Sequence, residues 1–263
     1  MKGTVRVGIG GWTFAPWRKS FYPKNLSQKR ELEFASRQLT SIEINGTYYR
    51  TQKPESFARW YEETPENFVF ALKGPMFATN RRNLAEAEAS ITRFFKSGVI
   101  NLKEKLGPIN WQFLPTKRFD VADFEAFLKL LPKTIDGHEA RHAVEVRHDS
   151  FHTAEFVEVL RSYQTAAVFT DKDQFPQIPD ITSSFVYARL QRSSKEEENG
   201  YPADAIDVWA QRALTWSQGK IPKGLEAVAS PCKTPPRDVF IYFIDGFKPK
   251  APAAAMALIK RLK

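Results

Sequence analysis

The sequence predicts a closed barrel of eight parallel β-strands, each followed by a connection that packs outside the barrel. The chain has 263 residues, close to the roughly 250 residues of a typical β/α barrel. Eight short apolar segments rich in β-branched and aromatic residues alternate with segments of helical periodicity. Such alternation, repeated to eight and ending on a helix, favours a closed barrel over an open sheet. We therefore expect one domain that spans residues 1–263.

The eight predicted strands read as nearly continuous apolar runs, as expected of strands that are buried on both faces. They are Val5–Gly11, Ser41–Asn45, Phe68–Lys73, Ile109–Phe113, Ala143–Arg147, Ala166–Asp171, Phe185–Leu190 and Val239–Ile244.

Six helices are predicted from an initiating residue followed by apolar residues at helical spacing. The initiating residues are Asn25, Pro54, Asp123, Thr153, Pro202 and Pro252. We expect Pro132 to stop the helix that follows Asp123. Only 13 residues separate Asp171 from Phe185, and they include Pro176 and Pro179. The sixth helix of the barrel is therefore predicted to be short or absent.

The overall charge points to an anionic ligand. The formal net charge is +9 and the pI is about 9.5, which favours a phosphorylated small molecule or a nucleic acid as partner. Cys232, expected in a proline-rich loop, is the only cysteine, so no intrachain disulfide can form and a reducing compartment is favoured. No apolar run approaches the roughly 18 residues of a membrane span, and the start lacks the apolar core of a signal peptide. We expect a cytoplasmic protein without membrane contact.

No motif for an organic cofactor is recognised. Gly8, Gly10 and Gly11 follow a predicted strand, but Thr13 stands where the dinucleotide-binding fingerprint requires its last glycine. Two histidine pairs, His138 with His142 and His148 with His152, have a spacing that suits zinc only on a helix with further ligands. A divalent metal on carboxylate oxygens is conceivable, and its identity stays open.

Polar side chains from six strands are predicted to meet at one end of the barrel. Residues two apart on a strand share a face, and the C-terminal ends of barrel strands carry the reactive groups of this fold. Burying such groups without partners costs several kcal/mol each. The residues that this rule selects are Glu43, Asn45, Lys73, Gln112, Glu145, Arg147, Asp171, Tyr187 and Arg189.

At these residues the chain resembles the YecE-like family, domain of unknown function 72, along nearly its whole length. The resemblance is carried by Gly11-Trp12, Trp17, Phe21-Tyr22-Pro23, the element from Glu43-Ile44-Asn45 to Tyr48-Tyr49-Arg50, Lys105-Leu106-Gly107-Pro108 and Val144-Glu145-Val146-Arg147-His148. It implies a TIM barrel and no particular activity.

The chain also departs from the family pattern. Asn80 follows Thr79 where the family usually has histidine, and Gln191 stands where an Arg-x-His-Gly element has its histidine. Asp245 and Ala254 stand where asparagine is usual. The departures imply either that these residues are not essential or that the branch has an altered activity.

These observations favour a hydrolase or lyase that acts on a phosphate-bearing substrate, nucleic acid included. Glu43 and Glu145 are predicted to act as acid and base with Asp171 assisting, and these three carboxylates could also hold a magnesium or manganese ion. Lys73, Arg147 and Arg189 are predicted to neutralise phosphate charge. The other predicted substrate-binding residues are Trp12, Asn45, Tyr48, Tyr49, Gln112, His148 and Tyr187.

Two alternatives stay open. A carbohydrate-active barrel would use Glu43 and Glu145 as paired carboxylates, with aromatic residues as sugar platforms. A non-catalytic module would bind RNA or a protein partner. The sequence leaves the substrate, the oligomeric state and the pathway open.

Overall fold

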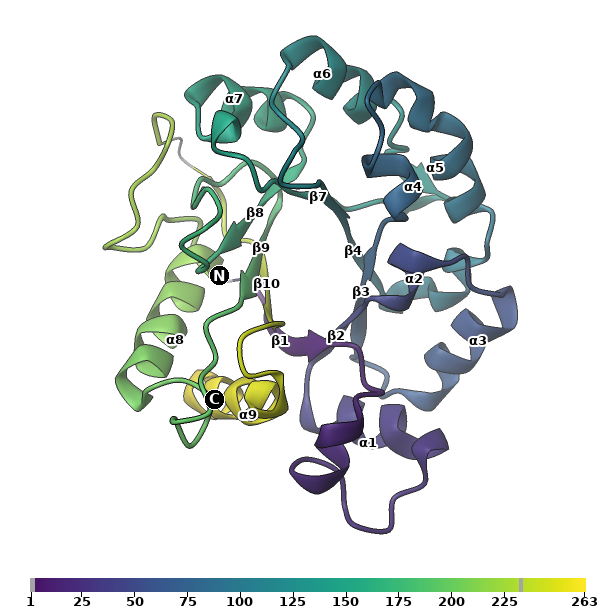
Figure 1. Cartoon of the computed structure of the whole chain (residues 1–263), viewed down its shortest axis with the longest axis vertical. Helices are drawn as coiled ribbons and strands as arrows, with labels where there is room; N and C mark the ends of the chain where they lie inside the picture. Colours follow the sequence, from purple (N-terminus) through teal and green to yellow (C-terminus); the bar gives the residue numbers. More distant parts are fainter. Residues whose placement is uncertain (1–2, 232–233) are drawn as a thin grey trace.

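The computed structural model describes residues 3–231 and 234–263, so Cys232 lies outside the described residues. Eight parallel strands close into a barrel in the order β1-β10-β9-β8-β7-β4-β3-β2, and the helices lie outside this ring (Figure 1). Pairing between β1 and β10 completes the circle, with Val5 beside Val239 and Ile9 beside Phe243. The predicted fold is confirmed.

All eight predicted strands are present. The barrel strands are β1 Val5–Gly10, β2 Ser41–Ile44, β3 Val69–Lys73, β4 Leu106–Gln112, β7 His142–Glu145, β8 Ala166–Thr170, β9 Phe185–Leu190 and β10 Asp238–Phe243. The largest shifts from prediction are at β4, which begins earlier, and at β7, which ends before Arg147. A short antiparallel pair that was not predicted, β5 Thr134–Ile135 and β6 His138–Glu139, precedes β7.

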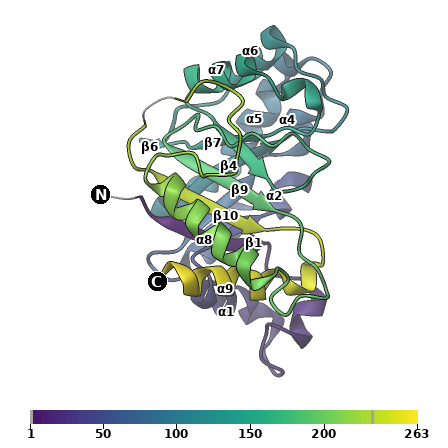
Figure 2. The ribbon, with the colours of Figure 1, turned by 90° about the vertical axis from the view of Figure 1, so that its left-hand side faces the viewer.

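Helices surround the barrel on its outer face. They are α1 Glu31–Gln38, α2 Gly46–Tyr49, α3 Pro54–Glu63, α4 Met76–Thr79, α5 Glu88–Phe95, α6 Val121–Lys129, α7 Ala154–Ser162, α8 Ala203–Ser217 and α9 Ala251–Leu262. Short 3₁₀ helices are Ala15–Lys19, Gln28–Arg30, Leu84–Ala87, Val99–Lys105, Asp149–Phe151 and Lys248–Lys250. Figure 2 shows α8 and α9 against the side of the barrel that β9, β10 and β1 form. No helix among the described residues is long and apolar enough to cross a bilayer.

Two predicted helix starts are wrong. The helix expected from Asn25 begins only at Glu31, because Ser27 has extended backbone angles and a 3₁₀ turn comes first. The helix expected after Asp123 begins at Val121, because the Asp120 carboxylate accepts the Asp123 N–H and caps the helix one turn earlier. The predicted Thr153 cap is present, since its hydroxyl accepts the Phe156 N–H.

The predicted gap at the sixth helix is also present. Residues 171–184, all of them described, form loop rather than helix, and in Figure 1 the sector between α7 and α8 contains loops. The buried Asp180 carboxylate accepts the N–H groups of Val228 (2.8 Å) and Ala229 (3.0 Å), and it lies 3.8 Å from Arg161. Two loops distant in sequence thus cover this part of the barrel.

The barrel interior is apolar below and charged above. Its lower part is filled by Val69, Ala71, Ala143, Ala166, Val168, Phe185, Phe240 and Tyr242, all buried. On β1, Gly8 leaves room for the neighbouring strand, because a Cβ atom there would lie 1.9 Å from the Ser41 carbonyl oxygen. This close approach sets the position of β2, the strand that carries Glu43.

We predict that Gly8→Ala lowers the free energy of unfolding by about 1–3 kcal/mol, because the added methyl group overpacks a backbone contact. Denaturant unfolding measures the change. Gly46→Ala is the matched control, since its Cβ would meet only the end of Gln52, at 3.4 Å. Equal stability of the Gly8 variant and the wild type would contradict this account of the β1–β2 contact.

Candidate functional site

A layer of charged side chains lies on top of the apolar interior, at the C-terminal ends of the strands. Glu43 on β2, Glu145 on β7 and Arg189 on β9 have exposed fractions of 0%, 1% and 2%. The alternation of side chains along the strands predicts this inward orientation, and the burial of both carboxylates confirms it.

Arg189 joins the two carboxylates. Its Nη2 lies 3.0 Å from Glu43 Oε1 and its Nη1 donates to Glu145 Oε2. Burial lowers the pKa of this guanidinium, but the charges of Glu145 and Glu43 have the larger combined effect. The pKa of Arg189 therefore lies above its usual value. Arg189 is therefore a permanent cation that compensates two buried anions.

Two further groups from the barrel interior hold the carboxylates. The Tyr187 hydroxyl donates to Glu43 Oε2 at 2.5 Å, and burial followed by the charge of Glu43 raises the pKa of Tyr187 well above 10. Asn110 was not predicted, yet its Nδ2 lies 3.4 Å from Glu43 Oε2 and 3.3 Å from Glu145 Oε2. It lies two residues before Gln112 on β4, so the same alternation rule would have selected it.

Lys73 lies at the end of β3 beside this network. Its ammonium donates to Gln112 Oε1 at 2.6 Å and lies 4.0 Å from the centre of the Tyr48 ring. Burial, and then the charge of Arg189, lower the pKa of Lys73 from 10.5 to about 8. A fraction of this amine is therefore neutral at physiological pH.

Arg147, just beyond β7, binds the other oxygen of Glu145 through Nε at 2.8 Å and Nη2 at 2.6 Å. Burial alone would raise the pKa of Glu145, but Arg189, Arg147 and Lys73 bring it down to about 2. When Lys73 is protonated, three cations share two carboxylates, so the group carries an excess positive charge.

Asp171 does not belong to this group, contrary to our prediction of an assisting carboxylate. Its oxygens accept the Gln191 N–H at 2.6 Å and the Tyr201 hydroxyl at 2.9 Å. Burial raises the pKa of Asp171, while the Gln191 N–H, the Tyr201 hydroxyl and the charge of Arg192 lower it. Strand alternation predicts the face of the strand on which Asp171 lies, but it does not predict which groups donate hydrogen bonds to its carboxylate.

The structure does not support a metal site at Glu43, Glu145 and Asp171 or at the two histidine pairs. Among the described residues, no group of three or more histidine, cysteine, aspartate or glutamate side chains could hold a metal ion. His142 is a core residue: Trp111 donates to its Nδ1 at 3.1 Å, its Nε2 lies 2.8 Å from the Pro132 carbonyl, and burial lowers its pKa to about 4. His148 Nδ1 accepts the Ser150 N–H at 3.1 Å and so caps the start of the 3₁₀ helix Asp149–Phe151.

The remaining predicted binding residues lie at the rim. Trp12 packs edge-on against Trp60 and, with Asn45, lines a cavity of about 270 Å³ at the end of β1 and β2. Tyr49 is 67% exposed and packs against Tyr48, which is buried. Of the rim aromatics, Tyr48 is the one in contact with Lys73.

The fold and the site together define a β/α barrel with a charged layer at the C-terminal ends of its strands. The chain belongs to the DUF72 family: the model of this family, "Protein of unknown function DUF72", matches residues 6–263. The predicted resemblance is therefore confirmed.

Relatives agree with this assignment. The UPF0759 protein YecE of Escherichia coli strain K12 is 28% identical over 150 residues, which cover 56% of this chain and 50% of that protein. The chain thus spans about half the length of this relative. A DUF72 protein from Thermotoga maritima MSB8 has a TM-score of 0.74 at 22% identity, with 98% and 99% of the two chains covered. A D-psicose 3-epimerase shares the fold at a TM-score of 0.51, 11% identity and 100% and 96% coverage.

We predict that Arg189→Met lowers the free energy of unfolding by about 3–5 kcal/mol, because two buried carboxylates lose their shared cation. Denaturant unfolding at neutral pH measures this loss. Arg30→Met removes an exposed ion pair with Glu33 and is the control, for which a much smaller change is expected. Equal losses in the two variants would contradict the role of Arg189.

We also predict an acid dependence that belongs to Glu145. Its pKa in the folded protein, about 2, lies below the usual 4.5, so its ionisation stabilises the fold above pH 4.5. That stability is lost as the pH falls from 4.5 towards 2. The stability difference between wild type and Glu145→Gln should therefore shrink over this range in denaturant titrations. A difference that does not change with pH would contradict the lowered pKa.

Proposed function

We propose that the protein is an enzyme that acts on a phosphate-bearing substrate at the C-terminal mouth of the barrel, in a lyase or hydrolase reaction. The observation that carries the proposal is Lys73, a buried amine with a pKa of about 8 beside two arginines. A lysine lowered in this way can take up or release a proton near neutral pH, as a general base must.

The geometry favours Lys73 over the two glutamates as the group that exchanges the proton. Glu145 is bound on both oxygens by arginines and has a pKa of about 2, so it stays ionised and is a weak base. Glu43 is bound on both oxygens by Arg189 and Tyr187. In this proposal both carboxylates position Arg189. Their negative charges also act on the Lys73 ammonium and partly offset the lowering of its pKa.

The excess positive charge supports an anionic substrate. The Arg147 side chain is 19% exposed, more than those of Arg189 and Glu145, and its guanidinium lies 4.8 Å from the centre of the Phe175 ring. It is therefore the cation best placed to meet a phosphate from solvent, while Lys73 and Arg189 lie deeper. A site of this kind would stabilise developing negative charge with fixed cations.

The carbohydrate alternative has less support. Both Oε2 atoms lie within 3.4 Å of the same Asn110 nitrogen, so the carboxylates are no farther apart than the roughly 5–10 Å of glycosidase pairs. A glycosidase, however, needs one carboxyl with a raised pKa to act as the acid. The lowered pKa of Glu145 and the Arg189 guanidinium between the two groups disfavour that chemistry.

We predict that the Lys73 amine titrates with a midpoint near pH 8. Carbon-13 NMR of the lysine Cε atoms measures this, and Lys73→Met identifies the resonance by its loss. Since the pKa of Lys73 is lowered, a rate that depends on the neutral amine should rise with pH through about 8. A midpoint near the ordinary 10.5 would contradict the proposed role.

Turnover of a panel of sugar phosphates, nucleotides and oligonucleotides tests the activity itself. We expect one member to react and its rate to fall by 10²-fold or more in Lys73→Met, the range of a lost general base. Lys29→Met, which removes an exposed lysine outside the mouth, is the control. Binding without turnover across the panel would instead favour the non-catalytic module.

A further inference from the structure

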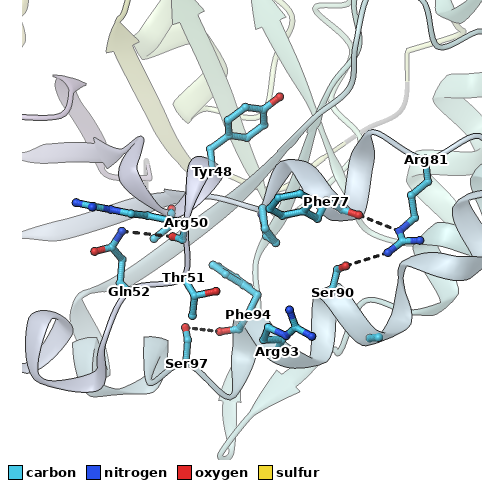
Figure 3. Close-up of a pocket in the computed structure, with 13 residues that line it drawn as sticks. Tyr48, Arg50, Thr51, Gln52, Phe77, Arg81, Ser90, Arg93, Phe94 and Ser97 are labelled. Carbon is cyan, nitrogen blue, oxygen red and sulfur yellow. Dashed lines mark hydrogen bonds between the residues drawn. The ribbon is translucent and has the colours of Figure 1, made fainter.

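A second cavity lies beside the charged layer, between α2, α4 and α5. Its volume is about 290 Å³, at the lower end of the roughly 300–1,000 Å³ of ligand sites. The lining comes from the segments after β2 and β3, which form the rim of the barrel mouth. In the view of Figure 3, Arg50 lies at one end of the lining and Arg81 at the other, with Phe77 and Phe94 between them.

The cavity is strongly basic. Arg50, Arg81 and Arg93 line it, and none of the described lining residues is acidic. Arg81 is held in place, because its Nε donates to the Phe77 carbonyl at 2.9 Å and its Nη2 lies 3.2 Å from Ser90 Oγ (Figure 3). Its nearest carboxylate, Glu86, is 3.9 Å away and largely exposed. A fixed guanidinium loses little entropy on binding an anion such as phosphate.

An exposed aromatic ring accompanies these cations. Phe77 is 61% exposed and is one of the most exposed large apolar side chains among the described residues. Phe94, which also lines the cavity, is buried. An exposed phenyl ring offers a face on which a nucleobase can stack. Exposed aromatic surface beside arginines is the combination that proteins use for single nucleotide units.

Tyr48 connects this cavity to the charged layer. It belongs to the cavity lining, and its ring points away from the other labelled side chains in Figure 3. On the side of the barrel, the same ring lies 4.0 Å from the Lys73 ammonium. A ligand in the cavity would therefore lie one side chain away from the amine to which we assign the proton transfer.

We propose that this cavity binds a nucleotide unit, with its base on Phe77 and its phosphate on Arg81 and Arg93. The inference rests on the proposed function and makes it more specific, because it names nucleotides as the phosphate-bearing substrate class. The phosphate on Arg81 and Arg93 is then a different one from the phosphate that meets Arg147. The unit is either a free nucleotide or one residue of a single strand, since both present the same base and phosphate.

Calorimetric titration with adenosine 5′-monophosphate, ribose 5-phosphate and adenosine tests the proposal. The monophosphate should bind more tightly than either fragment. Phe77→Leu should weaken the monophosphate on the order of tenfold through lost stacking and leave ribose 5-phosphate unchanged. Arg93→Gln should weaken both phosphorylated probes. Arg30→Gln, which removes the same charge near α1, should change neither.

Three outcomes would overturn the nucleotide site: no heat with the monophosphate at millimolar concentration, equal binding of all three probes, or equal effects of Arg93→Gln and Arg30→Gln. A single-stranded oligonucleotide then separates the two sources. Tighter binding than the monophosphate, with a salt slope that shallows by about 1 in Arg93→Gln, indicates a strand. Affinity equal to that of the monophosphate indicates a free nucleotide.

Failure of this inference can be told apart from failure of the proposed function. A Lys73 amine that titrates near pH 8 and supports turnover of a phosphate ester other than a nucleotide, together with wild-type probe binding in Phe77→Leu, removes only the nucleotide site. Nucleotide binding that Phe77→Leu and Arg93→Gln weaken, together with a Lys73 midpoint near 10.5, removes only the proposed chemistry.

Discussion

The guanidinium of Arg189 between Glu43 and Glu145 is the interaction on which the mouth of the barrel depends. Two ionised carboxylates in the interior would each cost several kcal/mol if they were unpaired. A planar guanidinium can meet both at once with separate N–H groups, which the single ammonium of a lysine does less well. Through Glu145 the same cation is coupled to Arg147, and through Gln112 it is coupled to Lys73. The lowered pKa of Lys73 follows first from its burial and then from the positive charge of Arg189.

The alternation of side chains along parallel strands predicted much of this layer. It selected Glu43, Glu145 and Arg189 because each strand of a barrel buries one face inside and the other under helices. The rule specifies a face and says nothing of partners, and for this reason it grouped Asp171 with the others. Asp171 instead accepts a backbone N–H from the residue after β9, a contact that depends on how two loops meet.

Local signals were harder to rank in the helices and turns. Asp120 and Asp123 are both acceptable caps, and the structure uses the earlier one. Asp136-Gly137 has positive φ at both positions, as a tight two-residue hairpin turn requires. The flanking strands are only two residues long, too short for a hydrophobic pattern to mark them. His148 was selected because it lies at the end of a predicted strand. Its Nδ1 instead accepts a hydrogen bond from the backbone N–H of Ser150.

The loops that stand in for the sixth helix bear on the order in which the barrel assembles. Asp180 holds the amides of Val228 and Ala229 from 48 and 49 residues away, so its contacts close a long stretch of chain that contains β9 and α8. A helix in that place would have formed from neighbours in the chain at far smaller cost in loop entropy. We therefore expect this sector to close late during folding, and its amides to exchange with solvent together when it opens.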